Sequence, residues 1–338
     1  MYESFFGLSG KPFQLNPDPA FYFGSKGHSR AFAYLQYGLY QGEGFIVITG
    51  EVGAGKTTIV RSLMEQLDRN KVVAAQIVST QLDADDMLRA VGVAFGLPVG
   101  STSKSMLLAS IEAFLCQVAA DRKRALLIVD EAQNLTPKAV EELRMLSNFQ
   151  LGDQALLQSF LVGQPELRAM MQSPSMQQLR QRVIASYHLG PMDAAETQAY
   201  VEHRLRHVGW SDDPRFEPDA FARIHELTGG IPRRINTLCN RLMLAAFLGE
   251  QHALDTGDVD MIESEMRAEV GTDLRFAAPD YAVGTPPDVA RITPVHELLI
   301  RRLEERVERI ERTLGATIDL LHSVLHPDKG NPGNVAER

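Results

Sequence analysis

Short apolar runs typical of β-strands alternate with longer helical patterns through the first half of the chain, and this alternation limits the fold more than any other feature. The strand-like runs cover residues 44–50, 72–79, 124–132, 156–163 and, over a shorter stretch, 186–192. The helical patterns between them cover residues 57–67, 84–96, 103–122 and 136–149. Strand–helix–strand alternation of this kind gives right-handed crossovers. The sequence therefore predicts an α/β fold, with a mostly parallel sheet sandwiched by helices.

The strand pattern stops after about residue 192. Four helical patterns separated by Gly, Pro and Asp follow, at residues 193–209, 217–230, 231–249 and 255–270. Breaks of this kind mark the ends of helices. The sequence thus predicts a small all-helical domain at 193–270. The arginines from Arg204 to Arg241 are predicted to lie on solvated helical faces, the alternative being a basic patch.

The last part of the chain reads as a linker, a helix and a tail. Residues 271–294 are rich in Pro, Ala and Asp, as in a linker. Apolar residues then recur at three- and four-residue spacing at Ile300, Leu303, Val307, Ile310, Leu314, Leu321 and Val324. This spacing predicts a short coiled-coil helix at 295–326, the alternative being a single amphipathic helix that folds back on the core. Residues 327–338 are predicted to be disordered.

Composition favours a cytoplasmic protein with no charge-driven affinity for nucleic acid. The 338-residue chain carries a formal net charge of −9, and its sequence pI is about 5.5. Its two cysteines, Cys116 and Cys239, fall in apolar helical patterns, which indicates buried thiols in a reducing compartment. The first residues do not form a secretory signal, and nowhere do about 18 apolar residues follow one another, so no membrane-spanning helix is expected.

A glycine-rich stretch, "GEVGAGKTT" at residues 50–58, follows the first predicted strand and opens a predicted helix. It fits the phosphate-binding pattern G-x-x-x-x-G-K-[ST] in its required context, whereas the alternative is a tight turn without chemistry. Lys56 would reach the β- and γ-phosphates of ATP, and the Thr57 hydroxyl would bind Mg²⁺. The residues predicted to contact the nucleotide in this stretch are Gly50, Glu51, Val52, Gly53, Ala54, Gly55, Lys56, Thr57 and Thr58.

Two adjacent carboxylates, Asp130 and Glu131, end the apolar run "ALLIVDEAQ". Burying them without partners would be costly, but the carboxyl end of a parallel strand faces the crevice where ligands bind. Asp130 is predicted to hold Mg²⁺, and Glu131 to polarise the water that attacks the γ-phosphate. The alternative is a carboxylate pair that caps the next helix. The pair and the glycine-rich loop together predict ATP hydrolysis.

With these two motifs in place, the sequence resembles an AAA+ ATPase of the ExeA/GspA-type secretion ATPases. The resemblance rests on "FFGLSGKPFQLNPDPAFYF", "GEVGAGKTT", "VDEAQNL", "LVGQPEL", "LRQRV" and "TGGIPRRIN", and it covers about residues 1–268. Within that class it points to the secretion ATPases found beside exopolysaccharide and exosortase (PEP-CTERM) loci. It implies a P-loop ATPase domain at 43–192, a helical lid domain at 193–270, and a preceding linker at 1–42 that borders the adenine.

The resemblance also implies roles for residues outside the two motifs. Gln164 matches the sensor 1 residue, which contacts the γ-phosphate or the attacking water. Arg233 matches the sensor 2 arginine, which reaches the nucleotide from the lid, and Arg234 is the adjacent alternative. Arg182 or Arg180 is the implied arginine finger, supplied to the site of a neighbouring subunit. An arginine supplied in this way implies an ATP-dependent homo-oligomer, such as a ring.

Three residues of the N-terminal segment, Tyr22, Phe23 and His28, are implied to border the adenine ring. Aromatic side chains there could equally serve the core. For each arginine with an implied role, the alternative is a surface residue that makes ordinary ion pairs.

The implied function is an ATPase that drives or regulates the assembly or export of a cell-envelope machine. Its expected partners are further copies of itself and envelope secretion or polysaccharide-export proteins, with a peripheral position at the inner membrane only through them. One alternative is a DNA-associated regulator of the transposition (TniB/MuB-like) type, which the net charge of −9 argues against. Another is an adaptor whose ATP site only gates partner binding.

Overall fold

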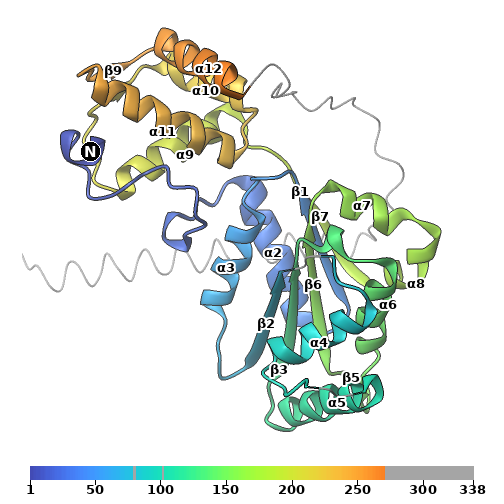
Figure 1. Ribbon diagram of the computed structural model, residues 1–338. Coiled ribbons are helices and arrows are strands. Elements are labelled where there is room, and N and C mark those ends of the chain that lie inside the picture. The colour runs from blue at the N-terminus through green and yellow to red at the C-terminus, as the bar shows by residue number, and fades with distance from the viewer. Residues whose placement is uncertain (79–80, 101–102, 271–338) are drawn as a thin grey trace, which may run out of the picture. The chain divides into compact units, whose positions relative to one another are not determined.

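The computed structural model describes three stretches of the chain, residues 1–78, 81–100 and 103–270 (Figure 1). All of them fall in one compact unit, Met1–Ala278. Three predicted segments lie outside the described residues: the linker at 271–294, the coiled-coil helix at 295–326 and the tail at 327–338. Among the described residues, no helix combines the length and the apolar character that crossing a bilayer requires.

Five strands form a parallel sheet in the order β2–β3–β6–β1–β7 (Figure 1). The strands are β1 Phe45–Gly50, β2 Val72–Val78, β3 Arg124–Asp130, β6 Leu157–Gly163 and β7 Val183–Leu189. Because every pairing is parallel, the carboxyl ends of all five strands meet at one edge of the sheet. The predicted fold class is confirmed. The fifth strand, expected only at 186–192, begins earlier, at Val183.

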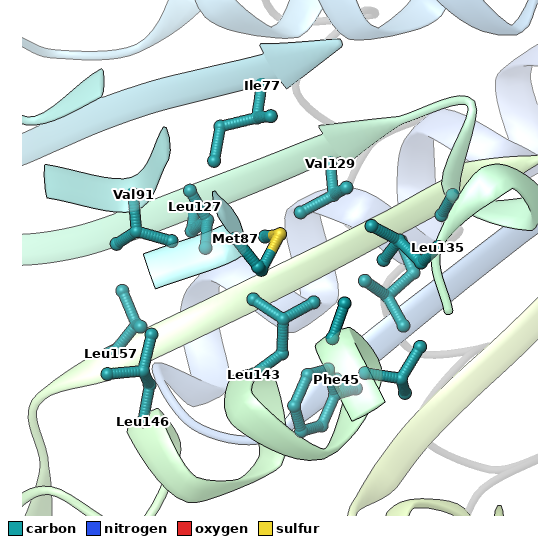
Figure 2. Packing of buried hydrophobic residues seen from close by; sticks show 14 of the residues in the cluster. Phe45, Ile77, Met87, Val91, Leu127, Val129, Leu135, Leu143, Leu146 and Leu157 are labelled. Carbon is teal, nitrogen blue, oxygen red and sulfur yellow. The ribbon is translucent and has the colours of Figure 1, made fainter. Parts of the chain in front are cut away.

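Helices cover both faces of the sheet because each buried strand alternates its side chains between two cores. Phe45 and Val47 lie in the core under α4, α5, α6 and α7, while Ile46 and Ile48 lie in the core under α2 and α3. Figure 2 shows the first core, where Leu143 and other helical side chains surround strand residues. The helices are α2 Lys26–Gln41, α3 Lys56–Gln66, α4 Ala84–Ala94, α5 Lys104–Ala120, α6 Pro137–Leu146 and α7 Pro165–Gln172.

Several short elements escaped the sequence patterns because two to four residues cannot show a period. A hairpin of two short strands follows α6, one helical turn follows β3, and two more follow α7. These elements are β4 Gln150–Leu151, β5 Gln154–Ala155, η2 Ala132–Asn134, η3 Pro174–Met176 and α8 Gln177–Arg180. Where a local signal was strong, the boundary agrees with it: the Thr136 hydroxyl accepts from the backbone N–H of Ala139, with Pro137 opening α6 as expected.

The second half of the described chain forms a helical part with its own core. Its helices are α9 Ala194–His207, α10 Pro218–Thr228, α11 Pro232–Leu248 and α12 Thr256–Val270. The expectation that this part is wholly helical was wrong in one detail. The segments that lead into α10 and α12 run side by side as the parallel strands β8 Arg215–Phe216 and β9 Ala253–Leu254. Each is two residues long and gives no strand pattern in the sequence.

The N-terminal segment contributes to two cores. Helix α1, Tyr2–Phe5, and the residues after it place Tyr2, Phe6, Leu8 and Phe13 in the core of the helical part. The Tyr2 hydroxyl donates to the Asn240 side chain at 2.9 Å. After the turn η1, Pro19–Phe21, the chain reaches α2, which packs on the sheet. This path carries the segment past the carboxyl end of β1.

Candidate active site

The loop between β1 and α3 needs glycine at two positions. Gly53 and Gly55 have φ of 82° and 96°, in the region that disfavours side chains. A Cβ on Gly55 would lie 2.6 Å from His28 Nε2, and one on Gly53 would lie 2.4 Å from the Arg233 Cβ. The loop is therefore enclosed by the N-terminal segment and by the helical part. It ends at the amino terminus of α3, where the helix dipole favours an anion.

Lys56, the first residue of α3, is buried and folds back over this loop. Its ammonium group donates to the carbonyl oxygens of Gly50, at 2.7 Å, and Glu51, at 2.9 Å. Burial lowers the pKa of Lys56, although the nearby carboxylates of Glu131 and Asp130 oppose the shift. The ammonium group is thus a desolvated donor, and it can exchange its carbonyl partners for phosphate oxygens.

The two predicted metal ligands lie together at the carboxyl end of β3. The Thr57 hydroxyl donates to Asp130 Oδ2 at 3.0 Å, and Asp130 Oδ1 accepts from the Glu131 backbone N–H. Burial raises the pKa of Asp130. Hydroxyl and carboxylate oxygens are the hard ligands that Mg²⁺ prefers. This pair fits an ion whose other ligands are phosphate oxygens and water. Among the described residues, no group of three or more His, Cys, Asp or Glu side chains is placed to hold a metal ion.

Glu131 is held in an uncommon backbone conformation, with φ 53° and ψ 38°. Its Oε2 atom accepts from Gln164 Nε2 at 3.1 Å and from Gln133 Nε2 at 2.6 Å. Burial raises the pKa of Glu131, but these hydrogen bonds and the charge of Lys56 outweigh burial and hold it below the ordinary value. The carboxylate is therefore ionised, as a group that polarises water must be.

A cavity of about 470 Å³ joins these groups, which is the size of a small-molecule site. Its lining includes Lys56, Thr57, Glu131 and Gln164 from the α/β part. The helical part contributes Arg233 to the lining but not its predicted alternative, Arg234. The Arg233 backbone N–H also donates to the Gly53 carbonyl at 3.1 Å, so α11 contacts the glycine-rich loop directly.

The three residues predicted to border adenine, Tyr22, Phe23 and His28, also line this cavity. Both ring nitrogens of His28 are already occupied: Nδ1 lies 2.6 Å from Ser25 Oγ and Nε2 lies 2.9 Å from the Ala54 carbonyl oxygen. His28 thus braces the glycine-rich loop from outside. Since both nitrogens have partners, a ligand in the cavity would contact the carbon edge of the His28 ring.

Bracing by His28 gives a prediction for pH. Burial lowers the pKa of His28 below 6.5, while its bond to Ala54 and the charge of Glu196 oppose the shift. The unfolded chain therefore binds this proton first, and stability that is full above pH 6.5 is lost as pH falls below it. We expect His28→Gln to cost about 1 kcal/mol at pH 7 and to reduce the acid-induced loss. Urea unfolding of the wild type and the variant at pH 7, 6 and 5 measures the free energy of unfolding at each pH. If that free energy falls equally with pH in the two proteins, the prediction is wrong.

Close packing of Gly53 gives a second prediction. Gly53→Ala adds a Cβ in a left-handed conformation and against Arg233, whereas Gly96→Ala, at φ 78°, meets no atom within 4 Å. We expect Gly53→Ala to destabilise the protein by about 1–3 kcal/mol more than Gly96→Ala, because only the first is overpacked. Urea unfolding of both variants isolates the contact. Equal losses would show that α11 does not press on the loop.

Arg204 was missed as a site residue, and its predicted solvated position was wrong. Its side chain is only 6% exposed and lines the cavity. The guanidinium donates to the Tyr200 hydroxyl at 2.9 Å and to the Gln14 carbonyl at 3.2 Å, and lies 4.7 Å above the Phe21 ring. It ties the N-terminal segment to α9. The available signal was its spacing of four residues from Tyr200, on the apolar face of the helix.

The two candidate arginine fingers lie away from this cavity. The Arg182 guanidinium donates to the Ser147 carbonyl and hydroxyl, and its own carbonyl accepts from Phe45, at the amino end of β1. Arg180 donates to carbonyl oxygens of Met171 and Ser173. The glycine-rich loop leaves the other end of the six-residue β1, about 17 Å from Phe45. Neither side chain lines the cavity of its own chain.

Fold and site together define a P-loop protein of the AAA+ class, and a family model described as an AAA domain matches residues 39–171. General secretion pathway protein A from Aeromonas hydrophila is 41% identical over 268 residues, which are 79% of this chain and 48% of that protein. The predicted resemblance to the ExeA/GspA-type ATPases is therefore confirmed. The chain spans about half the length of this relative.

Solved structures with the same fold share little sequence. Cdc6p from Pyrobaculum aerophilum superposes with a TM-score of 0.56 at 17% identity, covering 78% of this chain and 70% of that one. The ORC1 protein of Aeropyrum pernix, solved in complex with DNA, gives 0.55 at 17% identity over 77% and 70%. At such identities the likeness shows the fold alone.

Proposed function

We propose that this protein is an ATPase that hydrolyses ATP with Mg²⁺ and uses the resulting motion to drive or regulate the assembly or export of a cell-envelope machine. The observation that carries the ATPase proposal is one cavity lined by Lys56, Thr57, Glu131 and Gln164, with Asp130 hydrogen-bonded to Thr57. The similarity to general secretion pathway protein A supports the envelope role.

Each group has a part in the proposed reaction. Lys56 and the loop amides bind the β- and γ-phosphates. Thr57 and Asp130 would hold Mg²⁺, which would supply positive charge to neutralise the phosphate oxygens. Glu131 orients and polarises the attacking water, and the Gln164 amide donates to that water or to the γ-phosphate. Arg233 reaches the phosphates from the helical part.

The contact between α11 and the glycine-rich loop supports a coupling of hydrolysis to motion. The Arg233 backbone bonds the loop, while its side chain faces the cavity. Loss of the γ-phosphate removes one partner of Gln164 and Arg233, which changes the preferred position of the helical part. Because neither Arg180 nor Arg182 lines its own cavity, we infer that one of them serves the site of a second copy in an ATP-dependent homo-oligomer.

The partners are proposed to be envelope secretion proteins, or polysaccharide-export proteins of exosortase loci. The protein would act in the cytoplasm and reach the inner membrane only through these partners. The proposed partners would respond to the movement of the helical part that follows hydrolysis.

Affinity capture from cells with Glu131→Gln protein tests this function. The variant should bind ATP and hydrolyse it poorly, which prolongs the ATP-bound assembly. Recovery of envelope-assembly proteins with Glu131→Gln, and not with the double variant Glu131→Gln/Lys56→Ala, is the expected result. Recovery of DNA with a transposase, or ATPase activity that DNA stimulates at several salt concentrations, would overturn the envelope role in favour of the DNA-associated alternative. Absence of Mg²⁺-dependent phosphate release from purified wild-type protein would overturn the ATPase proposal itself.

A further inference from the structure

We propose that Gln133 is a positioning residue for ATP hydrolysis: it fixes the Glu131 carboxylate and links it to the start of α7. The inference rests on the proposed ATPase function and adds a residue outside the predicted site. Gln133 lies in the turn η2, two residues beyond Glu131. Gln133 does not line the cavity, so its effect on the reaction would pass through Glu131, which does.

The Gln133 side chain makes one hydrogen bond with each end of its amide. Its Nε2 donates to Glu131 Oε2 at 2.6 Å, and its Oε1 accepts from the Gln164 backbone N–H at 3.0 Å. The Gln164 side chain closes the ring by donating to the same Oε2 at 3.1 Å. Only one orientation of the Gln133 amide satisfies a carboxylate and a backbone N–H together. The contacts therefore define which atom of Gln133 faces Glu131.

The surrounding backbone makes room for this amide. A Cβ on Gly163, the last residue of β6, would lie 2.7 Å from Gln133 Oε1. The left-handed conformation of Glu131 turns the chain back, so that Gln133 faces the carboxylate two residues before it. The Asn134 backbone N–H closes this turn by donating to the Glu131 carbonyl at 3.0 Å. Glycine at 163 and the turn at 131 both serve the same contact.

The ring has a consequence for the reaction. Two amide donors occupy Oε2 of Glu131, which leaves Oε1 to accept from water. Removing Gln133 takes away the shorter of the two bonds and leaves the Gln164 N–H, at the start of α7, without its acceptor. The Glu131 carboxylate is then held by the Gln164 amide alone, so its orientation is less well fixed. Phosphate binding by Lys56 and the loop is untouched, so hydrolysis should suffer and nucleotide affinity should not.

Two substitutions separate the donor from the acceptor. Gln133→Ala removes both bonds. Gln133→Glu keeps the length and the acceptor for Gln164, but places an oxygen against the Glu131 carboxylate. We expect each to lower kcat about 10- to 100-fold, as seen when groups that orient a reactive residue are removed. Gln172→Ala, a change at an exposed glutamine at the end of α7, is the matched control and should leave kcat unchanged.

The measurements are ATP turnover, affinity for a fluorescent ATP analogue, and thermal unfolding. The expected pattern is a loss in kcat with affinity and melting temperature retained, and a smaller effect of Gln133→Ala when Gln164 is already alanine. Wild-type kcat in both Gln133 variants would overturn the inference and leave the ATPase proposal standing. Equal losses of affinity and stability would overturn it as well, since they indicate a structural role. A wild-type protein without ATP turnover would overturn both proposals.

Discussion

Replacing Glu131 with glutamine is expected to lower ATP turnover by about 10²- to 10⁴-fold while ATP still binds. The change keeps the size of the side chain and removes the charge that polarises water. Lys56, Thr57 and Asp130, which are expected to bind the phosphates and Mg²⁺, are untouched. The amides of Gln133 and Gln164 can still donate to the remaining oxygen, so the ring around position 131 is retained.

Phosphate release and binding of a fluorescent ATP analogue, measured on the same preparation, check this result. Glu166→Gln is the matched control: Glu166 is an exposed carboxylate in the first turn of α7, and its charge weakly opposes the lowering of the Lys56 pKa by burial. It should retain turnover near that of the wild type. Equal turnover in Glu131→Gln and wild-type protein would exclude Glu131 as the group that activates water.

Removing the ammonium group of Lys56 is expected to weaken ATP binding by about 100-fold or more, which corresponds to the loss of a desolvated charge–phosphate contact. Lys56→Met keeps the apolar stem in place, so the packing under the loop is largely retained. What is lost is the cation that now bridges the carbonyl oxygens of Gly50 and Glu51. Turnover should fall with affinity, because the γ-phosphate is no longer fixed against Glu131.

Titration calorimetry with ATP and Mg²⁺ measures the affinity directly. Lys26→Met is a suitable control, since that ammonium is exposed and pairs with Asp193. It should bind ATP as the wild type does. If Lys56→Met also binds with wild-type affinity, the glycine-rich loop is not a phosphate site, and the ATPase proposal fails with it.

The sequence was sufficient for the parts of the structure that depend on local patterns. Buried strands show as apolar runs, and the sequence alone places the glycine-rich loop between a strand and a helix. The Thr57–Asp130 contact was foreseeable in the same way, because the carboxyl ends of parallel strands share one edge. Local patterns therefore predicted the sheet, and they placed the two residues proposed to bind Mg²⁺ close to each other.

What the sequence could not show depends on partners distant along the chain. The position of Arg204 is set by carbonyl oxygens of residues about 190 positions earlier, which no helical pattern reveals. Gln133 faces Glu131 only because Glu131 adopts a left-handed conformation, which is uncommon for a residue with a side chain. The strands β8 and β9 exist only as a pair. In each case the decisive contact joins segments whose meeting no local pattern encodes.

The docking of the first residues onto the helical part has a consequence for biogenesis. Tyr2 bonds Asn240, 238 positions away, and Phe6 and Phe13 complete the same core. Tyr2 is therefore synthesised 238 residues before its partner, so one side of this core leaves the ribosome well before the other. The α/β part can fold while synthesis continues. Phe6 and Phe13, in contrast, stay unburied until the helical part that covers them has been translated. Non-local closure of this kind slows folding and prolongs exposure to chaperones and to aggregation.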